Sequence, residues 1–119
     1  MSRYESPVTS HVLDTSLGIP AANVRVELQR LRDNVWVHVH EGRTNADGRV
    51  ASYLVPEAAV FEAGTYRIVF DTGRYFEANG VTEFLYPEVT VTFKVEDPTR
   101  HYHIPLLLNP FGYSTYRGS

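Results

Sequence analysis

Histidine is the residue type in this sequence best suited to moving protons near neutral pH, because its ordinary pKa is about 6.5. The chain contains five histidines: His11, His38, His40, His101 and His103. On a β-strand, the spacing of His101 and His103 places both imidazoles on one face, roughly 6–7 Å apart along the strand. Such a pair suits a shared metal ion, or one acid–base histidine beside a structural neighbour, and the spacing alone leaves both possibilities open.

Arg49 is the candidate for binding an oxygen anion. It follows a turn formed by residues 45–48, and a guanidinium there can hold a carbonyl or enolate oxygen through two hydrogen bonds. It can equally be a surface residue at the start of a strand. The isolated His11 has the same two interpretations, functional or an ordinary strand residue, whereas we expect His38 and His40 to be solvated strand residues.

The C-terminal residues 111–117 are rich in aromatic and hydroxyl side chains and poor in aliphatic ones. Ser114 and Ser119 have no base beside them in the sequence, and no Gly-x-Ser-x-Gly, phosphate-loop or His-Glu-x-x-His motif occurs. The sequence also has no cysteine. It therefore excludes disulfides, thiolate metal sites, iron–sulfur clusters and a cysteine nucleophile.

The elements that must position these residues are β-strands, because apolar residues alternate with polar ones along most of the chain. The alternation predicts about eight half-buried antiparallel strands, near residues 8–14, 24–31, 35–42, 49–54, 65–72, 87–95, 101–108 and 111–117. In the third of these, Val35, Val37 and Val39 share one face. A short helix is expected only within residues 73–79. Eight strands at this spacing favour a β-sandwich.

The predicted strand over residues 101–108 has an unusual outer face. Strict alternation assigns one set of side chains to the core: Tyr102, Ile104, Leu106 and Leu108. The opposite face then carries His101, His103, Pro105 and Leu107. Two histidines, a proline and a leucine make a poor solvated surface, so we expect this face to meet a partner subunit, a ligand or both.

Length and charge limit the remaining possibilities. A chain of 119 residues, 43% hydrophobic and 21% charged, fits one domain. Its formal net charge of −3 does not favour nucleic acid or an anionic membrane as a partner. No apolar run approaches the roughly 18 residues of a transmembrane helix, and no secretory signal is visible, so we expect a cytoplasmic protein.

Four segments of the sequence carry a resemblance to a known family. They are Ser10-His-Val-Leu-Asp14, Thr44-Asn-Ala-Asp-Gly-Arg49, His101-Tyr-His-Ile-Pro-Leu-Leu-Leu108 and Tyr113-Ser-Thr-Tyr-Arg-Gly-Ser119. Together they resemble the 5-hydroxyisourate hydrolases, also called transthyretin-related proteins. The ending Tyr116-Arg-Gly-Ser119 is similar to the tetrapeptide that separates these hydrolases from the transthyretins. The match begins near residue 8, so we expect residues 1–7 to be a flexible extension and residues 8–119 to form the domain.

The resemblance implies a transthyretin-like, all-β sandwich of two four-stranded antiparallel sheets with one short helix. It implies a homotetramer, built as a dimer of dimers, with active sites in a channel at the dimer–dimer interface. The implied reaction is hydrolysis of 5-hydroxyisourate to 2-oxo-4-hydroxy-4-carboxy-5-ureidoimidazoline in urate degradation, with no cofactor and no metal.

The resemblance also implies roles for individual residues. The implied catalytic residues are His11, Arg49, His103 and Ser119, and the implied substrate-binding residues are His11, Arg49, Ser114, Tyr116 and Arg117. Opening a cyclic amide with water requires a base, donors for the oxyanion and an acid for the leaving nitrogen. We favour His103 as the base, oriented by a neighbouring hydroxyl or by the C-terminus, and His11 as the residue that binds and polarises the substrate.

Two other functions compete with this hypothesis. The first is a non-catalytic transthyretin-like carrier of small aromatic ligands, and the second is a generic β-sandwich interaction module. A carrier needs an open, apolar channel, whereas Tyr116 and Arg117 would narrow it and the histidines would make its floor polar. The generic module predicts no tetramer and gives the tail no role.

Overall fold

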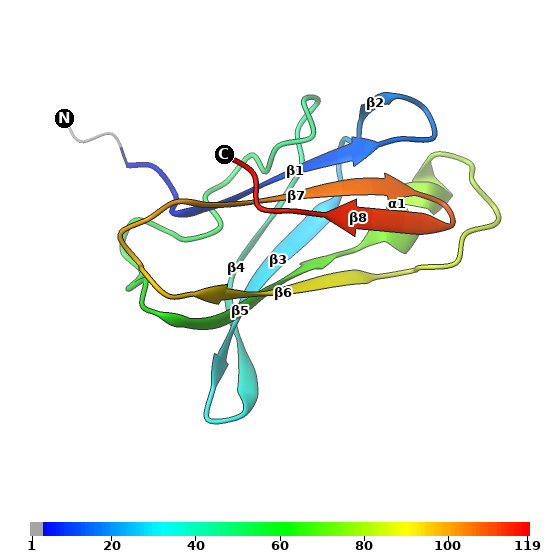
Figure 1. The fold of residues 1–119 in the computed structure, drawn as a ribbon. Coiled ribbons are helices and arrows are strands. Elements are labelled where there is room, and N and C mark those ends of the chain that lie inside the picture. Colours follow the sequence, from blue (N-terminus) through cyan, green and yellow to red (C-terminus); the bar gives the residue numbers. More distant parts are fainter. Residues whose placement is uncertain (1–3) are drawn as a thin grey trace.

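The computed structural model describes residues 4–119, which form two packed β-sheets and one short helix (Figure 1). The elements in chain order are β1 (Val8–Asp14), β2 (Ile19–Pro20), β3 (Arg25–Arg32), β4 (Val35–Arg43), β5 (Gly64–Phe70), α1 (Thr72–Ala78), β6 (Val89–Val95), β7 (Tyr102–Asn109) and β8 (Gly112–Thr115). One sheet has the strand order β2-β1-β7-β8 and the other β4-β3-β5-β6. The prediction of a sandwich of two four-stranded sheets with one helix is therefore confirmed.

The core lies between the sheets and follows the predicted alternation. Alternate residues are buried along β1, β5, β7 and the first half of β3, and the apolar ones are Val8, Val12, Val26, Leu28, Tyr66, Ile68, Phe70, Tyr102, Ile104, Leu106 and Leu108. Each large apolar side chain removed from water stabilises the fold by about 1.5–3 kcal/mol. Since the inner faces of β1 and β7 are fixed by this packing, their outer faces are fixed as well, and those faces carry His11 and His103.

One sheet differs from the all-antiparallel prediction, because β1 and β7 pair in parallel over their whole length. Residue 8 is the partner of residue 102 and residue 14 is the partner of residue 108. A parallel pair needs a long connection, and here the whole of the second sheet lies between the two strands in the sequence. The other pairings are antiparallel.

Residues 49–54 do not form the predicted strand. Only isolated bridges occur there, from Arg49 to His11 in one sheet and from Val50 to Thr44 beside the other. The segment crosses between the two sheets, so it cannot form a continuous ladder with either. The eighth strand is instead β2, only two residues long, which pairs with the end of β1.

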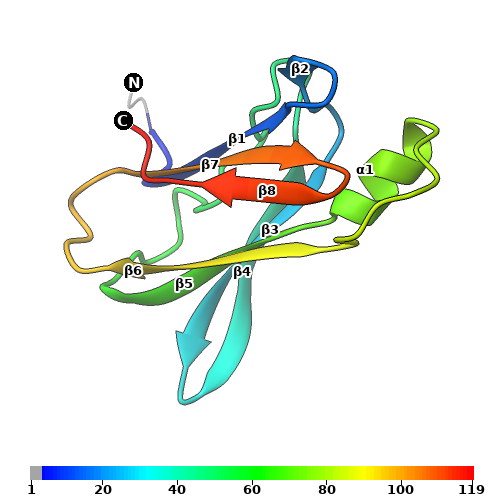
Figure 2. The same ribbon diagram turned by 45° about the vertical axis from the view of Figure 1, so that its right-hand side comes forward.

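The β3–β4 hairpin extends beyond the sandwich, as both views show (Figure 1, Figure 2). Val35 and Val37 near its tip are 60% and 42% exposed, so the alternation there does not mark a buried face. Within residues 4–119, both views show no strand of the β2-β1-β7-β8 sheet over this part of the hairpin (Figure 1, Figure 2). The alternating pattern therefore predicted the strand correctly and its environment incorrectly.

The helix α1 overlaps the predicted segment, residues 73–79, and one buried hydrogen bond joins it to the sheet that contains β1. Tyr75 Oη donates to Asp14 Oδ2 at 2.6 Å. Burial by itself would raise the pKa of Asp14, but hydrogen bonds from Ser16, Tyr75 and the backbone of Leu17 outweigh it and lower that pKa. The Asp14 carboxylate thus joins the helix to the end of β1. At seven residues α1 is short, and no helix within residues 4–119 is long and apolar enough to cross a membrane.

Of the extension predicted over residues 1–7, residues 1–3 lie outside the described part of the chain. Ser6 is buried, donates to Val8 O at 2.7 Å and accepts from Val55 N at 3.1 Å. Tyr4 donates to the carbonyl of the same Val55. These bonds hold residues 4–6 against the segment that follows Arg49.

Candidate active site

The parallel pairing of β1 with β7 brings the candidate histidines onto one surface. Thr9 is the register partner of His103, and His11 is the partner of Pro105. Neighbouring strands lie about 4.8 Å apart, so Thr9, His11 and His103 form one patch on the outer face of the sheet. Sequence alternation predicted the face for each strand but not that these two strands are neighbours.

The Thr9 hydroxyl links two histidines. Thr9 Oγ1 lies 2.8 Å from His103 Nδ1 and 2.8 Å from His101 Nε2. The two rings are 6.4 Å apart between centroids and tilted by 29°, which agrees with the spacing expected from the sequence. The expected neighbouring hydroxyl of His103 is therefore Thr9, a residue that the sequence analysis did not select.

His11 is held by the turn that precedes Arg49. Its Nε2 lies 2.7 Å from the carbonyl oxygen of Asp47. A carbonyl can only accept, so Nε2 carries the proton and Nδ1 is the remaining polar atom of the neutral ring. This contact fixes the tautomer of His11.

The turn itself requires glycine at residue 48. Gly48 has φ of +77°, and a Cβ there would lie 2.3 Å from Val12 O and 3.2 Å from the Cδ2 atom of His11. Asn45 Oδ1 accepts from the backbone N–H of Arg49 at 3.1 Å and completes the turn. The motif around residue 48 thus brings both His11 and Arg49 to the patch.

The C-terminal tail, residues 116–119 after β8, lies against the ring of His103. Gly118 N donates to His103 O at 2.9 Å, and a Cβ on Gly118 would lie 2.3 Å from His103 Cδ2. Only glycine allows the backbone this close to the ring. Tyr116 and Ser119, on either side of residue 118, are exposed.

Two further residues selected from the sequence, Ser114 in β8 and Arg117 in the tail, occupy different positions. Ser114 is the register partner of Leu107, and so shares the outer face of the sheet with the patch. Arg117 instead donates to His101 O at 3.2 Å, and its guanidinium lies 4.7 Å from the centre of the Tyr102 ring. Since Tyr102 belongs to the core face, Arg117 is directed toward the edge of the sandwich rather than toward the patch.

The electrostatics of the patch favour a neutral His103. Burial is the largest cause that lowers its pKa, and the positive charge of Arg49 and the neighbouring His101 and His11 lower it further. A neutral imidazole has a lone pair that can accept a proton. Arg49 is always charged, so it can stabilise an oxyanion but cannot act as a base.

A cavity of about 360 Å³ opens beside the patch. Its lining includes Thr9, Arg49 and His101, together with residues 4–6 and 52–54. The cavity is large enough for ordered water or a small molecule. Within residues 4–119, no three His, Asp or Glu side chains lie close enough together to hold a metal ion.

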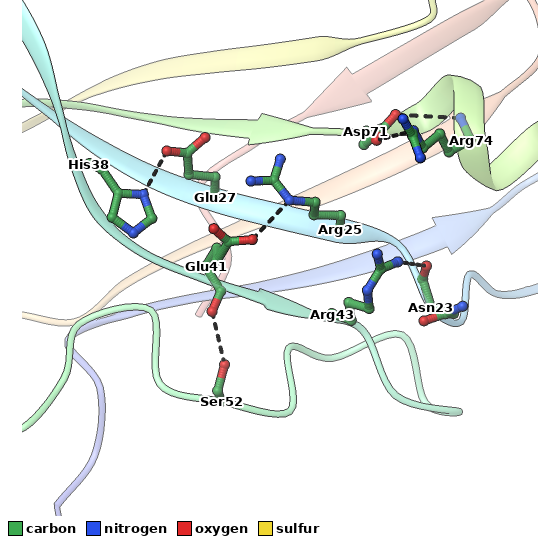
Figure 3. A network of polar contacts seen from close by, with 9 residues as sticks. All are labelled: Asn23, Arg25, Glu27, His38, Glu41, Arg43, Ser52, Asp71 and Arg74. Carbon is green, nitrogen blue, oxygen red and sulfur yellow. Dashed lines mark hydrogen bonds and ion pairs between the residues drawn. The ribbon is translucent and has the colours of Figure 1, made fainter.

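A second polar cluster lies on β3 and β4 and at the start of α1, and it is made mainly of ion pairs (Figure 3). Two of its arginines pair with carboxylates, Arg25 with Glu41 at 2.9 Å and Arg74 with Asp71 at 3.4 Å, and Arg43 donates to the backbone carbonyl of Asn23 at 3.4 Å. His38 is half exposed and pairs with Glu27 at 2.7 Å, in keeping with a solvated strand histidine. Exposed ion pairs of this kind contribute little to stability, because water and salt screen them. Ion pairs therefore dominate this cluster, whereas within residues 4–119 no carboxylate forms an ion pair with Arg49 beside the patch on β1 and β7.

Comparisons with known proteins agree with this assignment of the fold. The HIUase/Transthyretin family model matches residues 8–118. A 5-hydroxyisourate hydrolase of Salmonella dublin is 46% identical over 109 residues, which cover 92% of this chain and 78% of that protein. The structure of Klebsiella pneumoniae 5-hydroxyisourate hydrolase matches with a TM-score of 0.79 at 37% identity, covering 94% of this chain and 98% of the other. Transthyretin from Sparus aurata matches with a TM-score of 0.86 at 32% identity, covering 96% and 97%.

The family model covers nearly all of the described domain, and it includes β1, β7 and Gly118 of the tail. The similarity suggested by the four sequence segments is confirmed, and the chain belongs to the HIUase/Transthyretin family.

Proposed function

We propose that this protein hydrolyses 5-hydroxyisourate to 2-oxo-4-hydroxy-4-carboxy-5-ureidoimidazoline in urate degradation. The observation that carries the proposal is the convergence of His11, Arg49 and His103 on one face, with Gly118 of the tail packed on the His103 ring. The identity to a hydrolase over most of the chain supports the same conclusion.

His103 is the proposed base for the attacking water. Its lowered pKa keeps the imidazole neutral at neutral pH. When Nδ1–H donates to Thr9, the other ring nitrogen has the lone pair that receives the proton of water. Gly118 lies beside Cδ2 of the ring, the atom bonded to Nε2, so the tail borders the place where the water would bind.

Arg49 and His11 are the proposed substrate-binding residues. Arg49 supplies fixed positive charge to the oxygen that becomes negative as water adds to the carbonyl. His11 donates from Nε2 to Asp47 O, so its Nδ1 is free to accept a hydrogen bond from an N–H of the substrate and thereby bind and polarise it. Tyr116, Ser114 and Ser119 complete the proposed binding surface with hydroxyl groups, and Arg117 acts by fixing the tail.

The proposed assembly is a homotetramer made from two dimers. β6 and β8 are edge strands of the two sheets and lie at the same side of the sandwich in both views (Figure 1, Figure 2). Unpaired edges can pair with a second copy across a twofold axis, which makes each strand antiparallel to its copy. Ser114 lies on the outer face as the partner of Leu107, and Tyr116, two residues further along, is 56% exposed, so a second dimer over this face would cover it. Sedimentation tests this assembly, and a monomer of 13.5 kDa would contradict it.

The carrier alternative has the support of the transthyretin fold but fits the patch poorly. An apolar ligand over the patch would leave the polar atoms of His11, Arg49 and His103 without partners, at a cost of about 1–3 kcal/mol each. A catalyst uses these same groups. The charge and polarity of the patch therefore favour hydrolysis.

The ultraviolet absorbance of freshly generated 5-hydroxyisourate tests the proposal directly. We expect the protein to accelerate its decay beyond the spontaneous rate. Binding of an aromatic dye with no effect on the decay would favour the carrier instead. We retain the cytoplasm as the proposed compartment, and cell fractionation tests it.

A further inference from the structure

The hydroxyl of Thr9 has one proton but two imidazole partners, and this constrains both rings. If Thr9 donates to His101 Nε2, it must accept from His103 Nδ1–H. If it donates to His103 Nδ1, it must accept from His101 Nε2–H. The tautomers of the two histidines are therefore coupled through a single hydroxyl group, and only the first arrangement leaves a lone pair on Nε2 of His103.

The two rings lie in different environments, and the difference favours movement of positive charge from His103 to His101. His103 is half-buried beside Arg49, where a positive ring is unfavourable, whereas His101 is exposed and borders the cavity. The charged groups that act on His103 are Arg49, His101 and His11. Of these, only His101 is connected to it by the Thr9 hydroxyl.

We infer that Thr9 and His101 form a proton relay that fixes the tautomer of His103 and carries its charge to solvent. Thr9 is thus a positioning residue for the base, and His101 is the end of the relay that exchanges protons with water. The inference rests on the proposed hydrolysis for its role in turnover, but the coupling itself is a property of the free protein.

The proton transfers in the relay balance over one turnover. As the water oxygen bonds to the substrate carbonyl carbon, its proton passes to His103 Nε2. His103 Nδ1–H then passes to Thr9, the Thr9 proton passes to His101 Nε2, and His101 Nδ1–H leaves to solvent. His103 is now neutral with its proton on Nε2. When the carbon–nitrogen bond breaks, Nε2–H passes to the leaving nitrogen and the relay runs in reverse, taking one proton from solvent.

The relay predicts specific behaviour for three variants. Thr9→Val removes the hydroxyl with little change of shape, Thr9→Ser retains it, and His101→Ala removes the solvent end. Thr90→Val, at an exposed threonine on β6, is the matched control. We expect kcat to fall about 10-fold or more in Thr9→Val and His101→Ala, as for other groups that orient a reacting residue, with KM little changed. Thr9→Ser and Thr90→Val should retain the wild-type kcat.

Nitrogen-15 NMR of the imidazoles, without substrate, separates this inference from the proposed function. In the wild type and in Thr9→Ser we expect His103 to hold its proton on Nδ1. In Thr9→Val that preference should be lost, and the resonances of His101 and His103 should titrate independently. An Nε2–H tautomer of His103 in the wild type, or an unchanged tautomer and kcat in Thr9→Val, would overturn the relay. A wild-type protein that shows the coupling but does not hydrolyse 5-hydroxyisourate would instead overturn the proposed function.

Discussion

Substituting Gly118 with alanine should disable the site while leaving the fold intact. The added Cβ would lie 2.3 Å from Cδ2 of His103 and 3.2 Å from Cγ of Pro105. Carbon atoms in contact prefer about 3.5–4.0 Å, so the tail or the ring must move by about 1 Å or more. Pro105 is buried within β7 and cannot give way easily, so the displacement falls on the tail and on His103.

The expected effect on catalysis is large because the displaced group is the proposed base. A misplacement of about 1 Å can reduce the rate about 10²-fold. The effect on stability should be small, since Gly118 lies next to the chain end and its bond to His103 O contributes about 0.5–1.5 kcal/mol. The account therefore predicts a loss of kcat/KM for 5-hydroxyisourate with a nearly unchanged thermal midpoint.

Gly112→Ala is the matched control. Gly112 belongs to β8, a few residues before the tail, and its nearest atoms to an added Cβ are 3.8 Å away, on the Asn109 side chain. We expect this variant to keep wild-type activity. Full activity of Gly118→Ala would refute the reasoning, because it would mean that contact between the tail and the His103 ring has no role in the reaction.

Three further predictions follow from the same contacts. Because the pKa of His103 is lowered, activity should persist as pH falls through the ordinary imidazole pKa of about 6.5 and be lost only below it. In Arg49→Ala the residual rate should be about 10²-fold lower, and the pH at which activity is lost should rise because the positive charge beside His103 is gone. An unchanged pH–rate profile in this variant would mean that Arg49 does not act on His103. Deleting residues 117–119 should abolish turnover with little change in the thermal midpoint, and an active truncated protein would mean that the tail is only a chain end. Tyr75→Phe removes a donor to the buried Asp14 carboxylate and should lower the free energy of unfolding by about 1–3 kcal/mol without changing kcat; denaturant titration and the hydrolysis assay measure the two effects, and unchanged stability would show that this bond does not hold α1.

The core of the fold was predictable because it depends on a local pattern. Alternation along residues 101–108 identified Tyr102, Ile104, Leu106 and Leu108 as the inner face, and all four are buried. The pattern shows which side chains share a face of a strand, but not whether the second sheet covers that face. It therefore missed the exposure of Val35 and Val37, which depends on how far the other sheet reaches.

The neighbours of each strand were not predictable from the same pattern. The parallel pairing of β1 with β7 joins segments about 90 residues apart, and strand order is a property of the whole fold rather than of either segment. For this reason the sequence indicated His103 but not its partner Thr9. A resemblance to a family selected His11 and Arg49, while only the structure shows that the turn at Gly48 positions both of them.

The central claim is that His103 accepts the proton of water during hydrolysis of 5-hydroxyisourate. The most direct measurement is the decay of the absorbance of freshly generated substrate, with wild-type protein and with His103→Asn at equal concentration. We expect a decay well above the spontaneous rate for the wild type, and a rate about 10²-fold or more lower for the variant, with the same thermal midpoint. Equal rates for the two proteins would exclude His103 as the base, and a wild-type rate no greater than that of buffer alone would contradict the proposed function itself.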